Sequence, residues 1–158
     1  MIVMKKNLKI CCISSHGGHL HELEEALKDV DQSRMYWVTY KTKHTQMVME
    51  RKHRKCYFII DPVTNKLLFG VNAIQSLWHL MIERPNVVIS TGAGMAFLTL
   101  FLSKKIFRAK IIYIESAAAV VDATKTARMV YPMSDLFLIQ WEGLKTEFPN
   151  AIFTGGVL

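Results

Sequence analysis

The chain has 158 residues, 51% of them hydrophobic, which is the size of one domain and enough apolar material for a substantial core. Its 20 Lys and Arg residues exceed its 13 Asp and Glu residues, and the resulting net charge of +7 favours contact with phosphates, nucleic acid or an anionic bilayer. No stretch reaches the ~18 consecutive apolar residues that a membrane-spanning helix needs, and residues 1–7 do not have the pattern of a cleavable secretion signal.

Apolar runs of strand length alternate with segments of helical period along the first half of the chain. Residues 8–13 predict a strand, and apolar side chains spaced three and four apart across 20–30 predict an amphipathic helix. Two further strands are predicted at 35–39 and 56–60. The basic stretch between them, 41–55, is only weakly helical in its pattern.

The second half of the chain continues this alternation. A helix is predicted over residues 66–83, where apolar side chains recur on one face, namely Leu67, Val71, Ile74, Trp78 and Met81. The other expected elements are strands at 86–90, 110–114 and 136–139, helices at 93–107, 123–131 and 141–148, and an apolar segment at 151–153. Strands that are apolar on both faces and alternate with helices predict a doubly wound α/β fold with a mostly parallel sheet, in a single domain of residues 1–158.

A glycine-bearing turn, Ser15-His16-Gly17-Gly18-His19, follows the first predicted strand. Ligands of open parallel sheets bind beyond the carboxyl ends of the strands, so this turn is a candidate binding site. Glycines let the backbone approach a ligand closely, and the free amides of a helix N-terminus attract an anion such as a diphosphate. The spacing fits neither the dinucleotide fingerprint nor a Walker A loop. A tight turn that binds no ligand is the alternative.

Three histidines, His16, His19 and His21, crowd the same turn, and a purely structural turn does not need them. Histidine suits a general base that deprotonates a sugar hydroxyl, because its unperturbed pKa lies near neutrality. His19 stands at the expected helix start beside the glycines and is the candidate base. No fourth ligand at zinc spacing accompanies the three histidines, so we predict no metal and no other cofactor.

A second turn of small residues, Thr91, Gly92, Ala93 and Gly94, follows the strand predicted at 86–90. It offers a hydroxyl and another helix N-terminus, so it too is suited to a phosphate. Two such turns at one sheet edge would suit a diphosphate-bearing substrate. Close packing of a helix on the sheet through small residues is the alternative.

A carboxylate is expected at the same edge, because Glu115 and Ser116 directly follow the strand predicted at 110–114. A carboxylate in such a place can take part in the chemistry of a site. A helix cap or a solvated side chain is the alternative for a single glutamate at a strand end.

The helix predicted at 93–107 has almost no polar face, and Lys104, Lys105, Arg108 and Lys110 stand at its end or just beyond it. Apolar residues rimmed by cations are typical of a helix that lies on an anionic membrane. Burial in the core or in a subunit interface is the alternative. The chain has no recognition-helix or aromatic RNA-binding motif, so we expect no nucleic-acid partner.

Six short segments together carry a resemblance to a known family: residues 14–20, 89–94, 113–116, 130–132, 140–142 and 155–156. In this order and spacing they resemble the bacterial capsule and exopolysaccharide glycosyltransferase subunits related to the membrane-recruiting subunit of the eukaryotic lipid-linked GlcNAc transferase. That family in turn resembles the N-terminal half of MurG, which glycosylates a polyprenyl-diphosphate acceptor.

The resemblance implies one Rossmann-like domain of a GT-B glycosyltransferase that is divided between two chains. This chain would supply the acceptor and membrane side, on the cytoplasmic face of the cell membrane, and a separate donor-binding subunit would supply the UDP-sugar site. A heterodimer is therefore expected, with Gln140, Trp141, Gly155 and Gly156 at the partner interface. The sequence ends just after Gly155 and Gly156, at the point where a single-chain enzyme would be expected to continue into its donor domain.

By the same resemblance, His19 and Glu115 would be catalytic residues. The residues that would hold the acceptor diphosphate are Ser15, His16, Gly17, Gly18, Thr91, Gly92, Ala93, Gly94 and Ser116. One departure concerns the segment after Glu115 and Ser116, where relatives tend to carry an Arg and this chain has three alanines at 117–119. Two other hypotheses stay open: a non-catalytic activator or scaffold that recruits a separate transferase, and a stand-alone nucleotide-binding protein.

Overall fold

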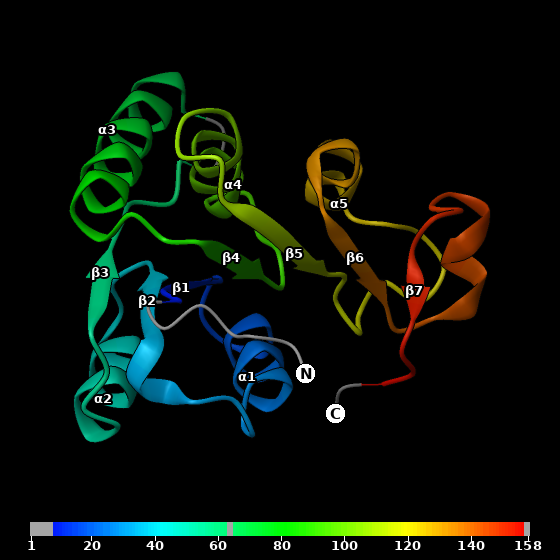
Figure 1. Ribbon diagram of the computed structural model, residues 1–158, viewed down its shortest axis with the longest axis horizontal. Coiled ribbons are helices and arrows are strands. Elements are labelled where there is room, and N and C mark those ends of the chain that lie inside the picture. The colour runs from blue at the N-terminus through cyan, green and yellow to red at the C-terminus, as the bar shows by residue number, and fades with distance from the viewer. Residues whose placement is uncertain (1–7, 63–64, 157–158) are drawn as a thin grey trace.

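The computed structural model describes residues 8–62 and 65–156. Its strands are β1 (Ile10–Ile13), β2 (Met35–Thr39), β3 (Cys56–Phe58), β4 (Val87–Ser90), β5 (Lys110–Ile114), β6 (Leu136–Ile139) and β7 (Ile152–Phe153). They form one sheet in the order β3-β2-β1-β4-β5-β6-β7, in which every neighbouring pair is parallel (Figure 1). The predicted doubly wound α/β fold is confirmed.

Helices cover both faces of the sheet (Figure 1). On one face lie α1 (Gly18–Ala26) and α2 (Lys43–Arg51), and on the other lie α3 (Lys66–Glu83), α4 (Ala96–Lys105) and α5 (Lys125–Val130). Three short 3₁₀ segments complete the described chain, at Gln32–Arg34, Tyr131–Met133 and Glu142–Thr146.

Alternate residues of the strands enter two separate cores, as the period of a strand requires. In β1, Cys11 and Ile13 belong to the core under α4 and α5, whereas Ile10 and Cys12 belong to the core under α1 and α2. The two cysteines are fully buried free thiols. Burial raises the pKa of Cys11 to about 12, so this thiol stays protonated and serves as a small apolar side chain.

The predicted element boundaries differ from the structure where a local conformation decides. The weakly helical stretch does form α2, because Thr42 and Thr45 build a capping box in which each hydroxyl accepts from the other residue's backbone amide. The helix predicted from residue 93 begins only at Ala96, because Ala93 has a φ of 79° that no right-handed helix allows. The expectation about residues 1–7 lies outside the described residues.

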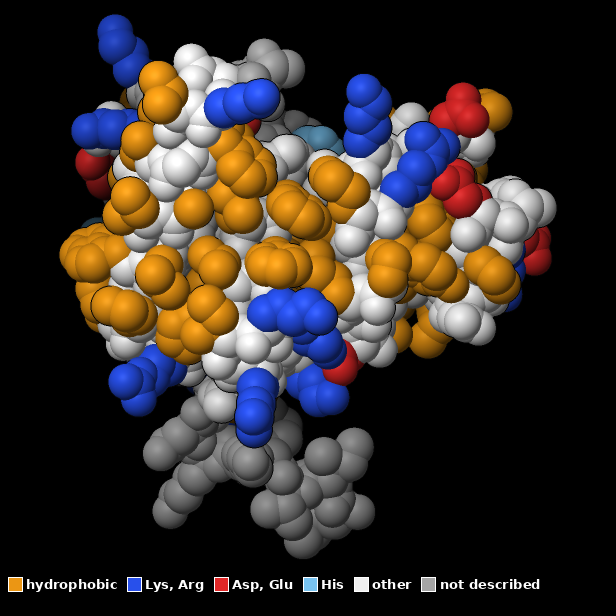
Figure 2. All heavy atoms as spheres, turned by 90° about the horizontal axis from the view of Figure 1, so that it is seen from above, with side chains coloured by type: hydrophobic (Ala, Val, Ile, Leu, Met, Phe, Trp, Pro, Cys, Tyr) orange, Lys and Arg blue, Asp and Glu red, His pale blue; other side chains and the backbone are white. Residues whose placement is uncertain are grey.

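The predicted apolar stripe of α3 exists, but it faces away from the core. Leu67 is 82% exposed and Ile74 71% exposed, and Val71, Trp78 and Met81 are exposed as well. The residues of α3 that are buried are mostly polar, namely Asn72, Ser76, His79, Leu80 and Glu83. Figure 2 shows the outer surface of this side of the molecule, with hydrophobic side chains spread across it and Lys and Arg side chains along its borders.

Hydrogen bonds explain why α3 turns its polar side inward. The amide of Asn72 donates to the carbonyls of Ile60 (2.7 Å) and Met95 (3.3 Å), and the Thr99 hydroxyl of α4 donates to the Ser76 hydroxyl at 2.8 Å. Because buried polar groups are costly unless they are paired, these bonds fix which side of the helix can face the sheet. The apolar side is therefore left on the outside.

The last turn of α3 is held at the amino ends of the strands by charge. The Glu83 carboxylate, 2% exposed, accepts from Lys9 (2.9 Å), from Lys55 (2.6 Å) and from the Tyr57 hydroxyl. Burial alone would raise the pKa of Glu83, but the hydrogen bonds from Lys55, Tyr57 and Lys9 outweigh it and lower the pKa to about 2. This carboxylate therefore stays charged throughout the physiological range.

Buried His79 should make the stability of the fold depend on pH. Burial lowers its pKa from 6.5 to about 4, so on acidification through this window the unfolded chain takes up a proton that the native chain does not. The free energy of unfolding should fall by about 3 kcal/mol between pH 6.5 and pH 4 from this residue. Urea unfolding of His79→Gln, which cannot titrate, should show a flatter dependence on pH; equal slopes in the two proteins would contradict a buried neutral His79.

Candidate functional site

Three loops meet at the carboxyl edge of the sheet. β1 pairs in parallel with β4, and β4 with β5, so the segments that follow these strands, 14–17, 91–95 and 115–124, lie side by side. The order of the strands reverses between β1 and β4, which is the topological switch point where open α/β sheets bind their ligands. The two predicted turns and the predicted carboxylate are therefore neighbours.

The first turn offers its backbone to a ligand. Gly17 has a φ of 74°, which favours glycine, and stands at the N-cap position of α1, where no side chain caps the first amides. Apart from the adjoining residues and the backbone of α1, no atom lies within 4 Å of the place where a Cβ of Gly17 or Gly18 would be. Open space above free amides at a helix N-terminus suits an anionic group.

Of the three histidines, His19 contacts the second turn. The Thr91 hydroxyl donates to the His19 carbonyl at 2.6 Å, and the His19 ring lies 3.9 Å from the Cβ position of Gly92. His16 is exposed and pairs with the hydroxyl of Tyr40, whose ring centroid lies 4.7 Å from its own. His21 is exposed on α1. The predicted cluster of histidines thus reduces to one residue that joins the two turns.

The second turn is shaped by Gly92. Its φ is 106°, and its amide donates to the Ser90 hydroxyl at 3.0 Å. An added Cβ would lie 2.7 Å from the Tyr113 hydroxyl, well inside van der Waals contact. Ala93 follows in a left-handed conformation that costs about 1–2 kcal/mol in a non-glycine residue. The chain therefore accepts local strain where the turn faces the site, as functional loops commonly do.

Glu115 lies deep in the third loop rather than at its surface. The side chain is fully buried, and its carboxylate accepts from the amide (2.9 Å) and the hydroxyl (3.3 Å) of Thr124, the N-cap residue of α5. Burial raises the pKa of Glu115 in spite of these hydrogen bonds. Its carboxylate is engaged in holding the loop against α5, and its predicted catalytic role stays a prediction.

Glu22 is a site residue that the sequence interpretation missed. It stands on α1, is only 4% exposed, and accepts from the Ala117 amide at 2.8 Å and the Ser116 hydroxyl at 3.3 Å. Glu22 therefore ties α1 to the third loop, and Ser116 is bound inside the chain. The sequence signal was the spacing, since residues three apart on a helix share one face and His19 precedes Glu22 by three.

The predicted partner residues have different positions. Gln140 is only 3% exposed and donates to the Glu115 carbonyl at 3.0 Å, so its side chain supports the third loop from within, and its contact with a partner stays a prediction. Trp141 is 41% exposed and donates to the Ala117 carbonyl at 2.7 Å. Gly155, with a φ of 73°, and exposed Gly156 follow β7, the outermost strand of the sheet. Of the four, Trp141 and the glycines reach the surface.

Comparison with known proteins identifies the family. Residues 59–157, more than half of the chain, match the family described as "Oligosaccharide biosynthesis protein Alg14 like". The chain belongs to the Alg14-like family.

A relative of this Alg14-like chain is the "UDP-N-acetylglucosamine transferase subunit ALG14" of Debaryomyces hansenii, which is 25% identical over 169 residues, covering 88% of this chain and 72% of the relative. Three other fungal subunits with the same name match over only 36% to 41% of their own length. The chain thus spans less than half of several curated relatives.

Two solved structures show the same fold. MurG of Acinetobacter baumannii has a TM-score of 0.71 at 11% identity, covering 86% of this chain and 42% of that one. UDP-N-acetylglucosamine 2-epimerase of Rickettsia bellii has a TM-score of 0.72 at 15% identity, covering 95% of this chain and 45% of that one. The Alg14-like chain therefore has the Rossmann-like α/β fold of a GT-B domain. The same fold occurs in MurG and in an epimerase, so it does not by itself choose the reaction.

Gly92→Ala should destabilise the Alg14-like domain. The new methyl group would meet the Tyr113 hydroxyl, and the φ of 106° would be strained in alanine. We expect the free energy of unfolding, measured in urea, to fall by about 2 kcal/mol. Gly94→Ala is the matched control, because its Cβ would meet nothing within 4 Å and its effect should be small. Equal effects of both substitutions would argue against this geometry of the second turn.

Proposed function

We propose that this chain is the acceptor-side subunit of a two-chain glycosyltransferase that transfers a sugar from a UDP-sugar to a polyprenyl-diphosphate-linked saccharide. The observation that carries the proposal is the switch-point site, where His19 lies between an open glycine turn and the Thr91–Gly92 turn. Membership of the Alg14-like family supports it, since relatives are named as subunits of a UDP-N-acetylglucosamine transferase. UDP-GlcNAc is accordingly the proposed donor, and the capsule or exopolysaccharide pathway stays a prediction.

In this proposal the two turns hold the acceptor. The acceptor diphosphate lies against the amides of the Gly17–Gly18 turn and beside the Thr91–Gly94 turn, with Ser15 and His16 at the rim. His19 takes the proton of the attacking sugar hydroxyl. The hydroxyl oxygen then bonds to the anomeric carbon of the donor, and the bond from that carbon to the diphosphate of UDP breaks with its electron pair leaving on UDP. Attack opposite the leaving group inverts the anomeric centre.

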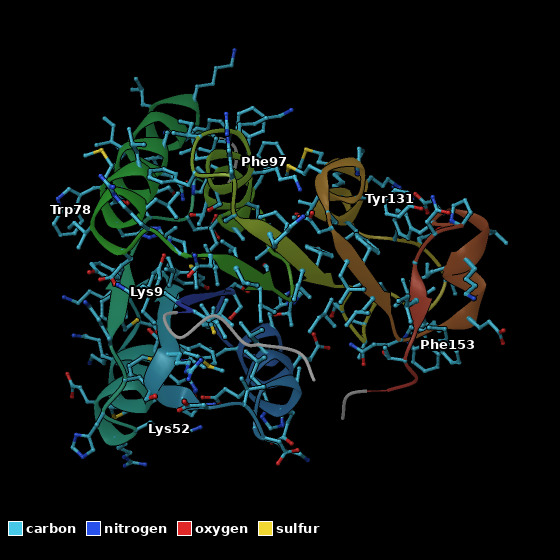
Figure 3. The ribbon with its side chains drawn as sticks, viewed as in Figure 1. Lys9, Lys52, Trp78, Phe97, Tyr131 and Phe153 are labelled. Carbon is cyan, nitrogen blue, oxygen red and sulfur yellow. The ribbon has the colours of Figure 1, made fainter. Side chains whose placement is uncertain are left out.

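The donor is proposed to come from a partner chain, because the sequence has no phosphate-loop fingerprint of its own. A surface suited to that partner lies at the outer end of the sheet, where Trp141 is 41%, Ile152 52% and Phe153 43% exposed. Figure 3 shows Phe153 on β7 at this edge. Exposed aromatic residues on an unpaired edge strand are typical of the centre of a protein interface.

The first test is turnover by the reconstituted pair. The donor-binding subunit, identified by its co-purification with this chain and then prepared by itself, should transfer little sugar from radiolabelled UDP-GlcNAc to a polyprenyl-diphosphate-linked acceptor until this chain is added. His19→Ala should then lower kcat by at least a hundredfold, because a positioned general base contributes about that much or more. His21→Ala, on the exposed side of the same helix, should leave turnover unchanged.

Two outcomes would contradict this assignment in different ways. If His19→Ala keeps full turnover, His19 is not the general base. If the partner alone shows appreciable activity in detergent, the activator or scaffold hypothesis is favoured. Buried Glu115 and the alanines at 117–119 favour that second hypothesis, because they leave this half with few reactive side chains beyond His19.

We further propose that the outer faces of α3 and α4 rest on the anionic inner surface of the cell membrane, which would make the chain a peripheral membrane protein. No helix within residues 8–62 and 65–156 is long and apolar enough to cross a bilayer. Trp78 on α3 and Phe101 and Ile106 on or after α4 are exposed, and Trp78 points outward in Figure 3. Lys105 and Arg108, on either side of Ile106 in the sequence, are exposed as well, and their positive charges would complement anionic lipid.

This orientation would also deliver the acceptor. Helices of such a sheet run opposite to its strands, so the N-termini of α3 and α4 lie at the carboxyl edge that holds the site. The polyprenyl chain of a lipid-linked acceptor would stay in the bilayer beneath α3 and α4 while its diphosphate reaches the glycine turns.

Membrane binding should depend on the outer face of α3. We expect the double variant Ile74→Ser/Trp78→Ser to bind phosphatidylglycerol vesicles at least tenfold more weakly in sedimentation, because two exposed apolar side chains are lost from the contact. Met47→Ser, on the exposed side of α2 beyond the opposite sheet face, is the control. Unchanged binding of the double variant would place the membrane contact elsewhere.

A further inference from the structure

Two buried polar atoms face each other on α1 without a hydrogen-bond partner. They are Nδ1 of His19 and Oε2 of Glu22, which lie 3.8 Å apart. The His19 side chain is 29% exposed although this nitrogen is buried, whereas the Glu22 side chain is only 5% exposed. A buried carboxylate oxygen without a donor is costly, and the ring nitrogen 3.8 Å away belongs to a residue proposed to carry a proton.

The other oxygen of Glu22 fixes the carboxylate in place. Oε1 accepts from the Ala117 amide at 2.8 Å and from the Ser116 hydroxyl at 3.3 Å, so α1 and the third loop hold it from two sides. The His19 backbone is fixed as well, by the Thr91 hydroxyl that donates to its carbonyl at 2.6 Å. With the Glu22 carboxylate and the His19 backbone held in this way, the remaining movement is rotation of the His19 imidazole ring toward or away from Oε2 of Glu22.

We propose that Glu22 is the positioning residue for His19: its carboxylate accepts a hydrogen bond from Nδ1–H, which keeps the proton on Nδ1 and leaves Nε2 unprotonated and turned toward the acceptor hydroxyl. This inference rests on the proposed role of His19 as the base. The present 3.8 Å separation exceeds a hydrogen bond by about 1 Å, and catalytic hydrogen bonds commonly tighten when the substrate is bound. Carboxylates orient histidines in this way in other active sites, both catalytic and metal-binding.

Two other titratable groups at this edge, Glu115 and Tyr113, are already engaged. Glu115 accepts from both the amide and the hydroxyl of Thr124. Tyr113 places its hydroxyl against Gly92, and burial raises its pKa, so it stays neutral. Among the described residues, the carboxylate within 4 Å of a His19 ring nitrogen is that of Glu22.

The decisive variant is Glu22→Gln. Its amide oxygen can still accept from Ala117, so the tie to the third loop is kept, but its NH₂ group would face Nδ1. His19 would then carry its proton on Nε2 and lose the lone pair that acts as base. We expect kcat of the reconstituted pair to fall roughly a thousandfold with the acceptor KM changed less than about threefold, as when a carboxylate that orients a catalytic histidine becomes an amide. Glu22→Asp should recover part of the loss.

A matched control lies one turn further along α1. Glu25 forms an exposed ion pair with Lys28 at 3.4 Å, so Glu25→Gln changes the charge of the same helix without touching the site. It should leave kcat unchanged.

The tautomer of His19 tests the inference without the partner or any activity. In ¹⁵N-labelled chain, with His19→Gln used to assign the signal, the wild type should show Nδ1 protonated and Nε2 free, and Glu22→Gln should show the reverse. A wild-type Nε2–H tautomer would overturn the inference even if Glu22→Gln failed to fold. Unchanged kcat in folded Glu22→Gln would overturn it too. If His19→Ala keeps full turnover while the expected tautomers are found, the proposed base is wrong and the Glu22–His19 pairing stands.

Discussion

The parallel pairing of β1 with β4 is the constraint on which the rest of the candidate site depends. Ile10 lies beside Val87 and Ile13 beside Ser90, so two turns far apart in the sequence leave the sheet as neighbours. The bond from Thr91 to the His19 carbonyl joins these turns directly. Both strands are buried within the sheet, so a one-residue slip of this register would move their side chains to the wrong cores.

The third loop is attached to this centre through its backbone. Glu22 accepts from the Ala117 amide, Trp141 donates to the Ala117 carbonyl, and Gln140 donates to the Glu115 carbonyl. These ties do not use the side chain of residue 117. The alanines that depart from the family pattern are therefore compatible with an ordered loop, and the loss is confined to any contact that an arginine side chain would have made with a phosphate.

The polar inner side of α3 leaves the apolar side of this helix exposed, where it forms the proposed membrane face. Asn72 is hydrogen-bonded beneath the helix and Ser76 is hydrogen-bonded to α4. Glu83 forms ion pairs with lysines at the amino ends of the strands, the edge of the sheet opposite the candidate site. The apolar outer side has no such partner within residues 8–62 and 65–156. The proposed membrane face, the acceptor edge and the partner edge at β7 thus occupy three different sides of one sheet. That arrangement would let a lipid-linked acceptor and a donor-bearing chain meet at His19.

The sequence by itself determined the fold class, most element positions and the two glycine turns, because these follow from local periodicity and from residues whose backbone preferences are strong. It also singled out His19, which stands at a strand-to-helix turn. Only the tertiary structure decided which side of α3 is buried, since periodicity finds a stripe but not the hydrogen bonds that compete for the interior. Likewise, only long-range pairing could show that Glu115 and Gln140 face inward and that Glu22 lies between His19 and the third loop. Those positions depend on contacts between segments that are distant in the sequence, and no local pattern encodes them.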